Sequence, residues 1–210
     1  MARTLLDHQN ASIRLRAALD AGTAPGTVPA PALVARCAVE PDFFVRDMLT
    51  WALTRLPAAT TVPLLLAELD SPVAQARSQA LHSLSKIGGA ESAAAFGPIL
   101  ALVGDADDEV AKAAWRTSAA LAPDAAARRA AARALVGQVG RGDAETRRSL
   151  SRAIIALGDE GVAELDGAAV TTDAAREHVA ETVRLLEDPD SGFAGAVHEA
   201  QRVAALGRAD

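Results

Sequence analysis

The most regular feature of the sequence is a hydrophobic pattern that recurs along most of its length. Five twelve-residue segments carry mainly apolar or small residues at their first, fifth, ninth and twelfth positions. At about 100° per residue these positions fall within one stripe of roughly 80°, which is typical of an amphipathic helix and not of a strand. The segments are VRDMLTWALTRL from Val45, ARSQALHSLSKI from Ala76, VAKAAWRTSAAL from Val110, TRRSLSRAIIAL from Thr146 and AREHVAETVRLL from Ala175.

Residues that start and stop helices flank these segments. An aspartate stands three residues before three of them, where its carboxylate can accept amide hydrogens of the first turn, and Pro or Gly follows four of them. A shorter sixth copy begins at Ile13 and stops at Gly22. The aspartates are Asp42, Asp107 and Asp143, and the terminating residues are Pro57, Gly88, Pro123 and Gly158.

The stretches between the segments also resemble one another, because a proline followed by an apolar run begins at Pro31, Pro63 and Pro98. We therefore expect each repeat, of about thirty residues, to consist of an A helix, a short turn and a B helix. Composition agrees with an all-α fold, since Ala, Leu and Arg dominate and only 3% of residues are aromatic.

Composition also narrows the class of protein. Half of the 210 residues are apolar, which excludes a disordered chain, and a single cysteine excludes a disulfide scaffold. The chain has no run of eighteen apolar residues, and its start, MARTLLDHQN, has no apolar run of signal-peptide length. We expect a cytoplasmic protein with no membrane partner.

The chain resembles the HEAT-repeat family, in the short form of many bacterial proteins and of the HEAT-like repeats of phycobilisome lyases. The resemblance covers roughly residues 10 to 190 and includes the aspartate caps, the closing leucine before Gly or Pro, and an apolar-Arg pair that is lost at Ala111. It implies an all-α, right-handed α-α superhelix of about six helical hairpins, a fold that serves mostly as a binding scaffold. The pairs are Ile13-Arg14, Val45-Arg46, Ala76-Arg77, Thr146-Arg147 and Ala175-Arg176.

We predict a single solenoid over residues 1–210. Residues 1–22 form an incomplete first repeat, residues 31–188 form five repeats, and residues 189–210 form a C-terminal capping helix with Phe193, Val197 and Leu206 available to cover the last repeat.

In HEAT solenoids the B helices line the concave groove, so the resemblance assigns the outward positions of these helices to a binding surface. The third and seventh positions run from an aromatic end through cations to glutamates. We predict that the groove is formed by Asp47, Trp51, His82, Lys112, Arg116, Arg148, Arg152, Glu177 and Glu181.

Each group of groove residues has a structural alternative. Trp51 is either a binding anchor or a partly buried side chain that leans on Leu81 or another neighbour, whereas we expect Trp115 in the core. The four cations either form an ordinary solvated face or, being like-charged at i,i+4 on two successive repeats, mark an anionic partner.

Catalytic and cofactor motifs give no positive signal. Cys37 lies on an apolar A helix and is predicted to be a buried structural thiol. The histidines fall on separate repeats without cysteine partners, so no zinc pattern forms. HEAT-repeat iron hydroxylases use several His-Glu pairs, whereas this chain has only His198-Glu199 and the reversed pair Glu177-His178. We therefore predict no catalytic residue, no cofactor and no metal. The other two histidines are His8 and His82.

The resulting hypothesis is a non-enzymatic protein–protein interaction scaffold that binds a protein or peptide with acidic residues in its groove. The alternative is nucleic-acid binding, or a HEAT-like DNA glycosylase using Asp47 and Trp51, although the pI near 5.2 disfavours a duplex-binding surface. A third hypothesis has the truncated first hairpin docking on another subunit or on itself, so the oligomeric state stays open.

Overall fold

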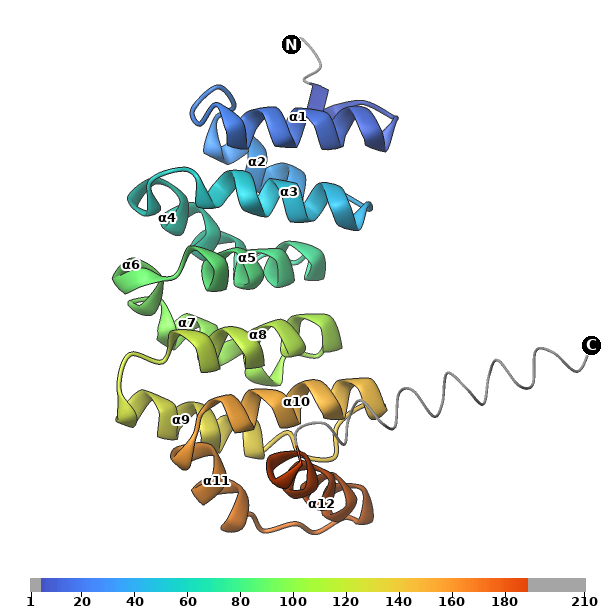
Figure 1. The fold of residues 1–210 in the computed structure, drawn as a ribbon, viewed down its shortest axis with the longest axis vertical. Helices are drawn as coiled ribbons and strands as arrows, with labels where there is room; N and C mark the ends of the chain where they lie inside the picture. Colours follow the sequence, from blue (N-terminus) through green and yellow to red (C-terminus); the bar gives the residue numbers. More distant parts are fainter. Residues whose placement is uncertain (1–4, 189–210) are drawn as a thin grey trace, which may run out of the picture.

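The computed structural model describes residues 5–188, which fold into helices arranged in two parallel rows (Figure 1). The B row consists of α1 (Ala11–Thr23), α3 (Phe43–Thr54), α5 (Ala74–Ile87), α8 (Asp108–Leu121), α10 (Ala144–Ala156) and α12 (Asp173–Glu187). The A row consists of η1 (Leu5–Asp7), α2 (Ala30–Cys37), α4 (Ala58–Glu68), α6 (Gly89–Ala93), α7 (Phe96–Ala101), η2 (Leu102–Gly104), α9 (Ala125–Val136) and α11 (Asp159–Asp166).

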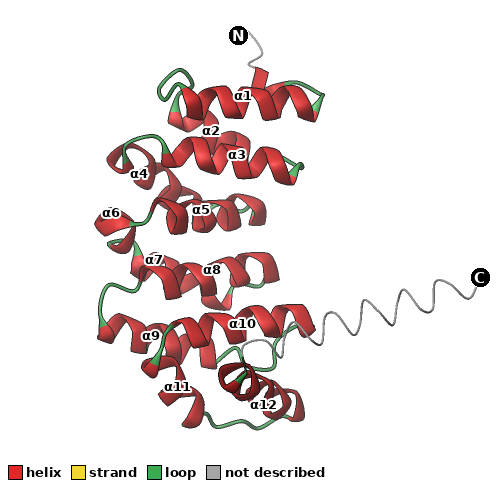
Figure 2. Cartoon of the chain, viewed as in Figure 1, coloured by secondary structure: helices red, strands yellow, loops and turns green. Residues whose placement is uncertain are grey.

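Each B helix from α1 to α10 packs on the next B helix along the chain and on an A-row element of its own hairpin, whereas α12 packs mainly on α10. Helix and loop account for all of the described residues (Figure 2). The prediction of an all-α solenoid of successive hairpins is therefore confirmed. The predicted capping helix of residues 189–210, with Phe193, Val197 and Leu206, lies outside the described residues.

The predicted hydrophobic stripe forms the core of the solenoid. In α3 its members Val45, Leu49 and Leu53 are fully buried, and the corresponding positions of α5, α8 and α10 are buried or half-buried. Trp115 is completely buried as predicted, and its indole N–H donates to the carbonyl oxygen of Val103 at 2.9 Å. This bond satisfies the one polar atom of a large apolar side chain.

The predicted helix ends are also present. Asp42 accepts the amide hydrogen of Val45 at 3.0 Å, and Asp107 and Asp143 cap α8 and α10 in the same way, each cap contributing about 1 kcal/mol. Gly88 and Gly158, which follow α5 and α10, have φ angles of +63° and +69°, a region that favours glycine.

The A row departs from the predicted pattern in two places. Helix α4 begins at Ala58 and contains Pro63 in its interior, so the proline does not start the helix as predicted. In the fourth repeat the A helix is broken into α6, α7 and η2.

In two of the five copies, the arginine of the apolar-Arg pair bridges consecutive repeats. Each arginine donates a hydrogen bond to the carbonyl oxygen six residues earlier, Arg14 to that of His8 and Arg77 to that of Ser71. Each also forms a bidentate ion pair with a carboxylate of the next repeat. Arg14 binds Glu40 at 2.7 Å through both nitrogens, and Arg77 binds Asp105 at 3.0 Å. In these two copies the arginine is thus a link between repeats that fixes the loop before its own B helix.

The fourth repeat, where Ala111 replaces this arginine, obtains the same link from elsewhere. Six residues before Ala111 is Asp105, and its carbonyl oxygen accepts a 2.6 Å hydrogen bond from Arg141, which belongs to the next repeat. Arg141 also binds Asp108 and lies over the ring of Trp115, 6.0 Å from its centroid. Arg141 of the fifth repeat therefore makes the contact to the Asp105 carbonyl that an arginine at position 111 would make.

Helix α12 is rotated relative to its predicted stripe, and Figure 1 shows it nearly end-on while α10 lies across the view. Its buried residues are Ala175, His178 and Thr182, whereas the predicted Leu186 is 40% exposed. The reason is a polar contact: His178 Nδ1 accepts the amide hydrogen of Gly140 at 3.0 Å, and Nε2 lies 2.9 Å from the carbonyl oxygen of Arg147. These hydrogen bonds therefore hold the His178 face of the helix inward, while Val179 and Val183 stay half-buried against the core.

Candidate functional site

The B row presents two adjoining hollows on one face. The larger, which we call the aromatic hollow, has a volume of about 670 Å³ and lies over α3, α5 and α8. The smaller, which we call the arginine hollow, has a volume of about 380 Å³ and lies between α8 and α10. Glu109 and Arg116 line both hollows, so together they form one groove along the B row.

Six of the nine residues predicted for the groove line it. Asp47, His82 and Arg116 line the aromatic hollow, and Lys112, Arg116, Arg148 and Arg152 line the arginine hollow. Trp51, Glu177 and Glu181 line neither hollow. The predicted surface is therefore shorter than the sequence pattern indicates, and it spans the middle repeats.

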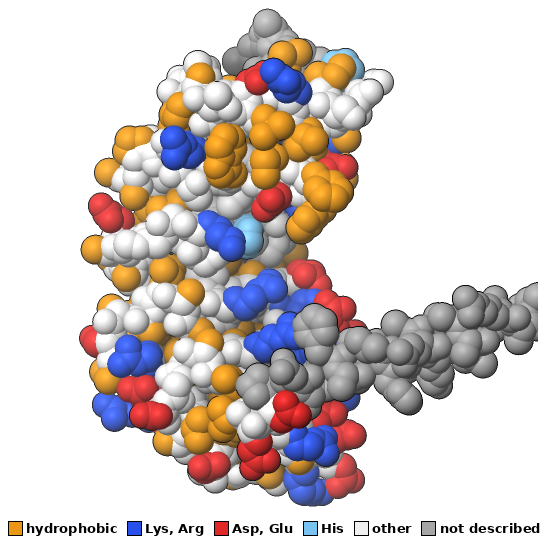
Figure 3. Space-filling view, viewed as in Figure 1, with side chains coloured by type: hydrophobic (Ala, Val, Ile, Leu, Met, Phe, Trp, Pro, Cys, Tyr) orange, Lys and Arg blue, Asp and Glu red, His pale blue; other side chains and the backbone are white. Residues whose placement is uncertain are grey.

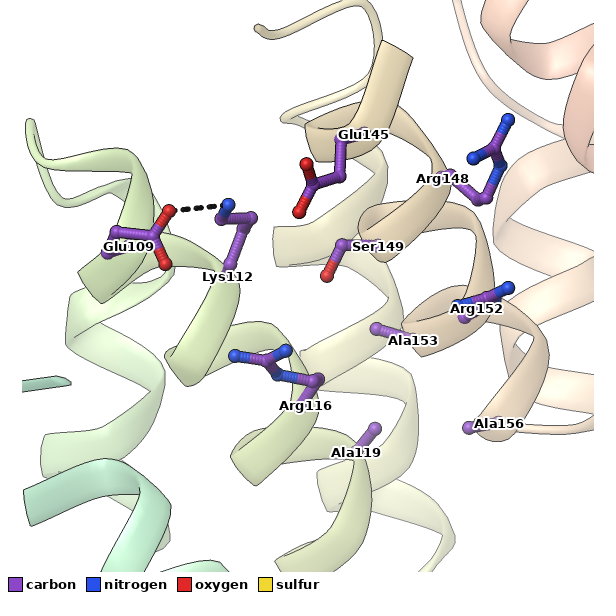
Figure 4. Close-up of a pocket in the computed structure, with 10 residues that line it drawn as sticks. All are labelled: Glu109, Lys112, Arg116, Ala119, Glu145, Arg148, Ser149, Arg152, Ala153 and Ala156. Atoms are coloured by element: carbon purple, nitrogen blue, oxygen red, sulfur yellow. Dashed lines mark ion pairs between the residues drawn. The ribbon is translucent and has the colours of Figure 1, made fainter. Parts of the chain in front are cut away.

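Three arginines give the groove its charge. Arg116, Arg148 and Arg152 are exposed, and they form no ion pair with any residue between 5 and 188. Figure 4 shows Arg116 extending from α8 in one direction and Arg148 and Arg152 extending from α10 in the other. Their guanidinium groups are spread along the groove and do not converge on one point.

Lys112 differs from the prediction of a solvent-facing cation. It is only 9% exposed, and its ammonium group forms an ion pair with Glu109 at 2.6 Å, the dashed contact in Figure 4. The hydrogen bond to Glu109 raises the pKa of Lys112, an effect that exceeds the opposing effect of burial. The position beside α10 leaves this side chain too enclosed to be unpaired, so Lys112 is a structural cation at the edge of the groove.

Trp51 combines the two interpretations that the sequence left open. It is 37% exposed, but one face of its ring lies on α1, where a Cβ at Gly22 would stand 2.2 Å from Trp51 Cζ3. One neighbour on which it leans is thus the backbone of Gly22. Gly22 lies within α1 and leaves the space for the ring.

Two aromatic residues escaped the sequence analysis. Phe43 and Phe44 begin α3 and are 65% and 69% exposed, with their rings packed edge to face at 5.6 Å between centroids. Phe43 lines the aromatic hollow and Phe44 does not. The sequence feature that could have revealed them is a pair of phenylalanines between the Asp42 cap and the first buried position, outside the hydrophobic stripe. Figure 3 shows hydrophobic side chains gathered over α1 and α3, above the basic part of the same face.

His82 lines the aromatic hollow and is half-buried. Burial lowers its pKa, and the positive charges of Lys86 and Arg116 lower it further, against the smaller opposite effect of Asp47. The imidazole therefore offers one hydrogen-bond donor and one acceptor to a ligand.

The two predicted glutamates lie on the rotated helix α12. Glu177 is exposed and Glu181 is half-buried. Because α12 turns its His178 face toward α10, these carboxylates do not continue the line of outward residues on α8 and α10. The predicted acidic end of the groove is thus absent from both hollows.

Other chemistry is limited within residues 5–188. No group of three or more His, Cys, Asp and Glu side chains there could hold a metal ion. Cys37 is buried, and burial raises the pKa of its thiol to about 12, as expected of a structural cysteine. None of the described helices combines the length and the apolar character needed to cross a membrane.

These features define the chain as an all-α repeat solenoid. No protein-family model and no curated protein matches the sequence. A designed armadillo repeat protein is 16% identical, with 87% of this chain and 97% of that protein covered and a TM-score of 0.49. Two engineered proteins from a structural genomics consortium are also similar. One is 16% identical, with 87% of this chain and 95% of that protein covered and a TM-score of 0.47. The other is 22% identical, with 90% of this chain and 94% of that protein covered and a TM-score of 0.46. At this level of identity the similarity concerns the fold alone.

Proposed function

We propose that this protein is a non-enzymatic, cytoplasmic, HEAT-like scaffold that binds an acidic segment of another protein in the groove of its B row. The observation that carries the proposal is the set of three exposed arginines, Arg116, Arg148 and Arg152, without carboxylate partners among the described residues. Like charges on neighbouring turns disfavour the free helix, and an acidic ligand relieves that repulsion while forming charge-assisted hydrogen bonds.

A peptide fits the groove better than a nucleic acid does. Carboxylates of Asp47, Glu109 and Glu145 line the same two hollows and would repel a phosphate backbone, and the whole chain carries a net charge of −6. A protein segment can place apolar or basic side chains beside those carboxylates, whereas a polyphosphate chain cannot. The glycosylase alternative is further weakened by Trp51, which packs on Gly22 and lies outside the groove.

A peptide selection with a charge-reversed variant tests the proposal. A phage-displayed library of random 16-residue peptides is selected on the wild type, and the recovered peptides are titrated against the wild type and against Arg116→Glu/Arg152→Glu. We expect acid-rich peptides that lose at least tenfold in affinity on the variant.

Arg55→Glu/Arg129→Glu is the matched control. It makes the same change of net charge at two exposed arginines that lie outside both hollows, and we expect it to bind the selected peptides as the wild type does. Peptides that bind the groove variant and the control equally would contradict the proposal. Preferential capture of a single-stranded or duplex oligonucleotide, with affinity falling steeply as salt rises, would support the nucleic-acid alternative.

A further inference from the structure

The aromatic hollow indicates a second requirement in the ligand. Resting on the proposed function, we infer that the preferred ligand is an extended peptide with two elements: an aromatic side chain that packs against Phe43, and acidic side chains about five to nine residues away that bind Arg116, Arg148 and Arg152.

The walls of the aromatic hollow favour a π system over an aliphatic side chain. Phe43 supplies an exposed ring, and the cations of Arg46, Lys86 and Arg116 surround the same space. An aromatic ligand can stack edge to face on Phe43 and receive cation–π contacts from these residues. Neutral His82 and the hydroxyl of Ser85 stand in the same hollow and suit a ring with a polar tip, such as tyrosine or tryptophan.

The spread of the guanidinium groups indicates several separate acidic side chains. In Figure 4 Arg116 points away from Arg148 and Arg152, with Ser149 between them. A single phosphate group needs donors that converge within hydrogen-bond distance of one point. An acidic stretch in an extended peptide instead meets the arginines one after another, and it can leave Lys112 paired with Glu109.

The distance between the two elements follows from the order of the B helices. Phe43 lies on α3, Arg116 lies two helices further on α8, and Arg148 and Arg152 lie three helices further on α10. Packed helices are about 8–10 Å apart, so these steps span about 16–30 Å, and an extended chain covers about 3.3 Å per residue. The acidic residues should therefore begin about five residues from the aromatic residue and end about nine residues from it.

The experiment uses fluorescein-labelled peptides of glycine and serine that carry one tryptophan and a run of three aspartates, with 1, 4, 6 or 12 residues between the tryptophan and the first aspartate. Fluorescence polarisation gives the affinity of each for the wild type, for Phe43→Ser and for Phe44→Ser. We expect the peptides with 4 and 6 intervening residues to bind at least tenfold more tightly than a tryptophan-free peptide. Phe43→Ser should remove this gain, while Phe44→Ser, the matched control at the neighbouring exposed ring, should keep it.

Two outcomes would overturn the inference and separate it from the proposed function. In the first, neither the tryptophan nor its spacing changes the affinity, yet the aspartate peptides still bind and Arg116→Glu/Arg152→Glu abolishes that binding. The two-element ligand is then wrong, and the acidic-peptide groove stands. If the wild type binds none of the peptides, both fail. Unchanged circular dichroism melting curves for both phenylalanine variants would show that the comparison concerns binding and not folding.

Discussion

The two ends of the solenoid are joined to their neighbours by opposite kinds of polar contact. At the N-terminal end a buried ion pair links Arg14 of α1 to Glu40, which is completely buried. At the C-terminal end a neutral network links His178 and Thr182 of α12 to Ser151 of α10. The first junction requires its groups to be charged, and the second requires its imidazole to be uncharged. Similar repeats can therefore be joined by contacts that respond differently to the same conditions.

The protonation states of the two junctions follow from their surroundings. Burial raises the pKa of the Glu40 carboxyl, but hydrogen bonds from Arg14, the Asp42 amide and Arg36 outweigh this and lower it to about 2. Burial lowers the pKa of His178. Because Nδ1 accepts a hydrogen bond from the Gly140 amide, protonation there would place two donors against each other.

The largest expected effect comes from breaking the charged junction. Arg14→Met should lower the free energy of unfolding by about 3 kcal/mol, because it leaves the buried Glu40 carboxylate without its main partner. Urea denaturation followed by circular dichroism measures the change. Arg16→Met is the matched control, since Arg16 pairs with Asp20 on the exposed face of the same helix, and it should change the stability by less than about 1 kcal/mol.

A smaller effect is expected from the neutral junction. His178→Phe should lower the local stability of α12 by about 2 kcal/mol, because the Gly140 amide and the Arg147 carbonyl lose a partner. Hydrogen exchange of the α12 amides reports this opening directly. The comparison variant is His82→Phe, at a half-buried histidine of the groove, and equal acceleration of α12 exchange in both variants would refute the role of the network.

The response to pH should separate the two junctions further. A lowered histidine pKa means that the unfolded state binds the proton more tightly, so the contribution of His178 is complete above about pH 6.5 and is lost as the pH falls toward its folded-state pKa. The contribution of Glu40 is complete above about pH 4.5 and is lost as the pH falls toward about 2. Hydrogen exchange between pH 7 and 4 should therefore show α12 loosening while α1 stays protected.

This prediction has a clear contrary result. Loosening of α1 before α12, or simultaneous loosening of both, would contradict the difference between the junctions. In His178→Phe the exchange of α12 should no longer depend on pH in the range near 6, once the intrinsic pH dependence of exchange has been subtracted.

The sequence predicted the parts of the fold that repeat and missed the parts that depend on one contact. Apolar periodicity was sufficient to place Val45, Leu49 and Leu53 in the core, because burial of a helix face follows from side-chain spacing alone. It placed Leu186 there wrongly, because a hydrogen-bonded histidine overrides the apolar stripe of α12. A periodicity argument weighs each position equally and cannot foresee one polar contact with a distant loop.

The candidate site was predicted in outline and differs in its details. Outward positions on the helices identified the three exposed arginines of the groove, because charged residues opposite a buried stripe must face solvent. They did not reveal that Lys112 is buried and paired with Glu109, although the i,i+3 spacing of the two residues on α8 was a signal for this ion pair. Phe43 was missed because it lies in the first turn of α3, before the twelve-residue segment in which the repeats were compared.

The link made by Arg141 has a consequence for how repeats can be gained or lost. Most repeats of a solenoid contact only their neighbours, so whole units can in principle be duplicated or deleted in a gene without harm to the others. The fourth repeat lacks its own arginine at Ala111 and borrows Arg141 from the fifth. A deletion that removed the fifth repeat would leave the Asp105 carbonyl without this donor, so we expect the fourth repeat to be more stable when it is copied or transplanted together with the fifth.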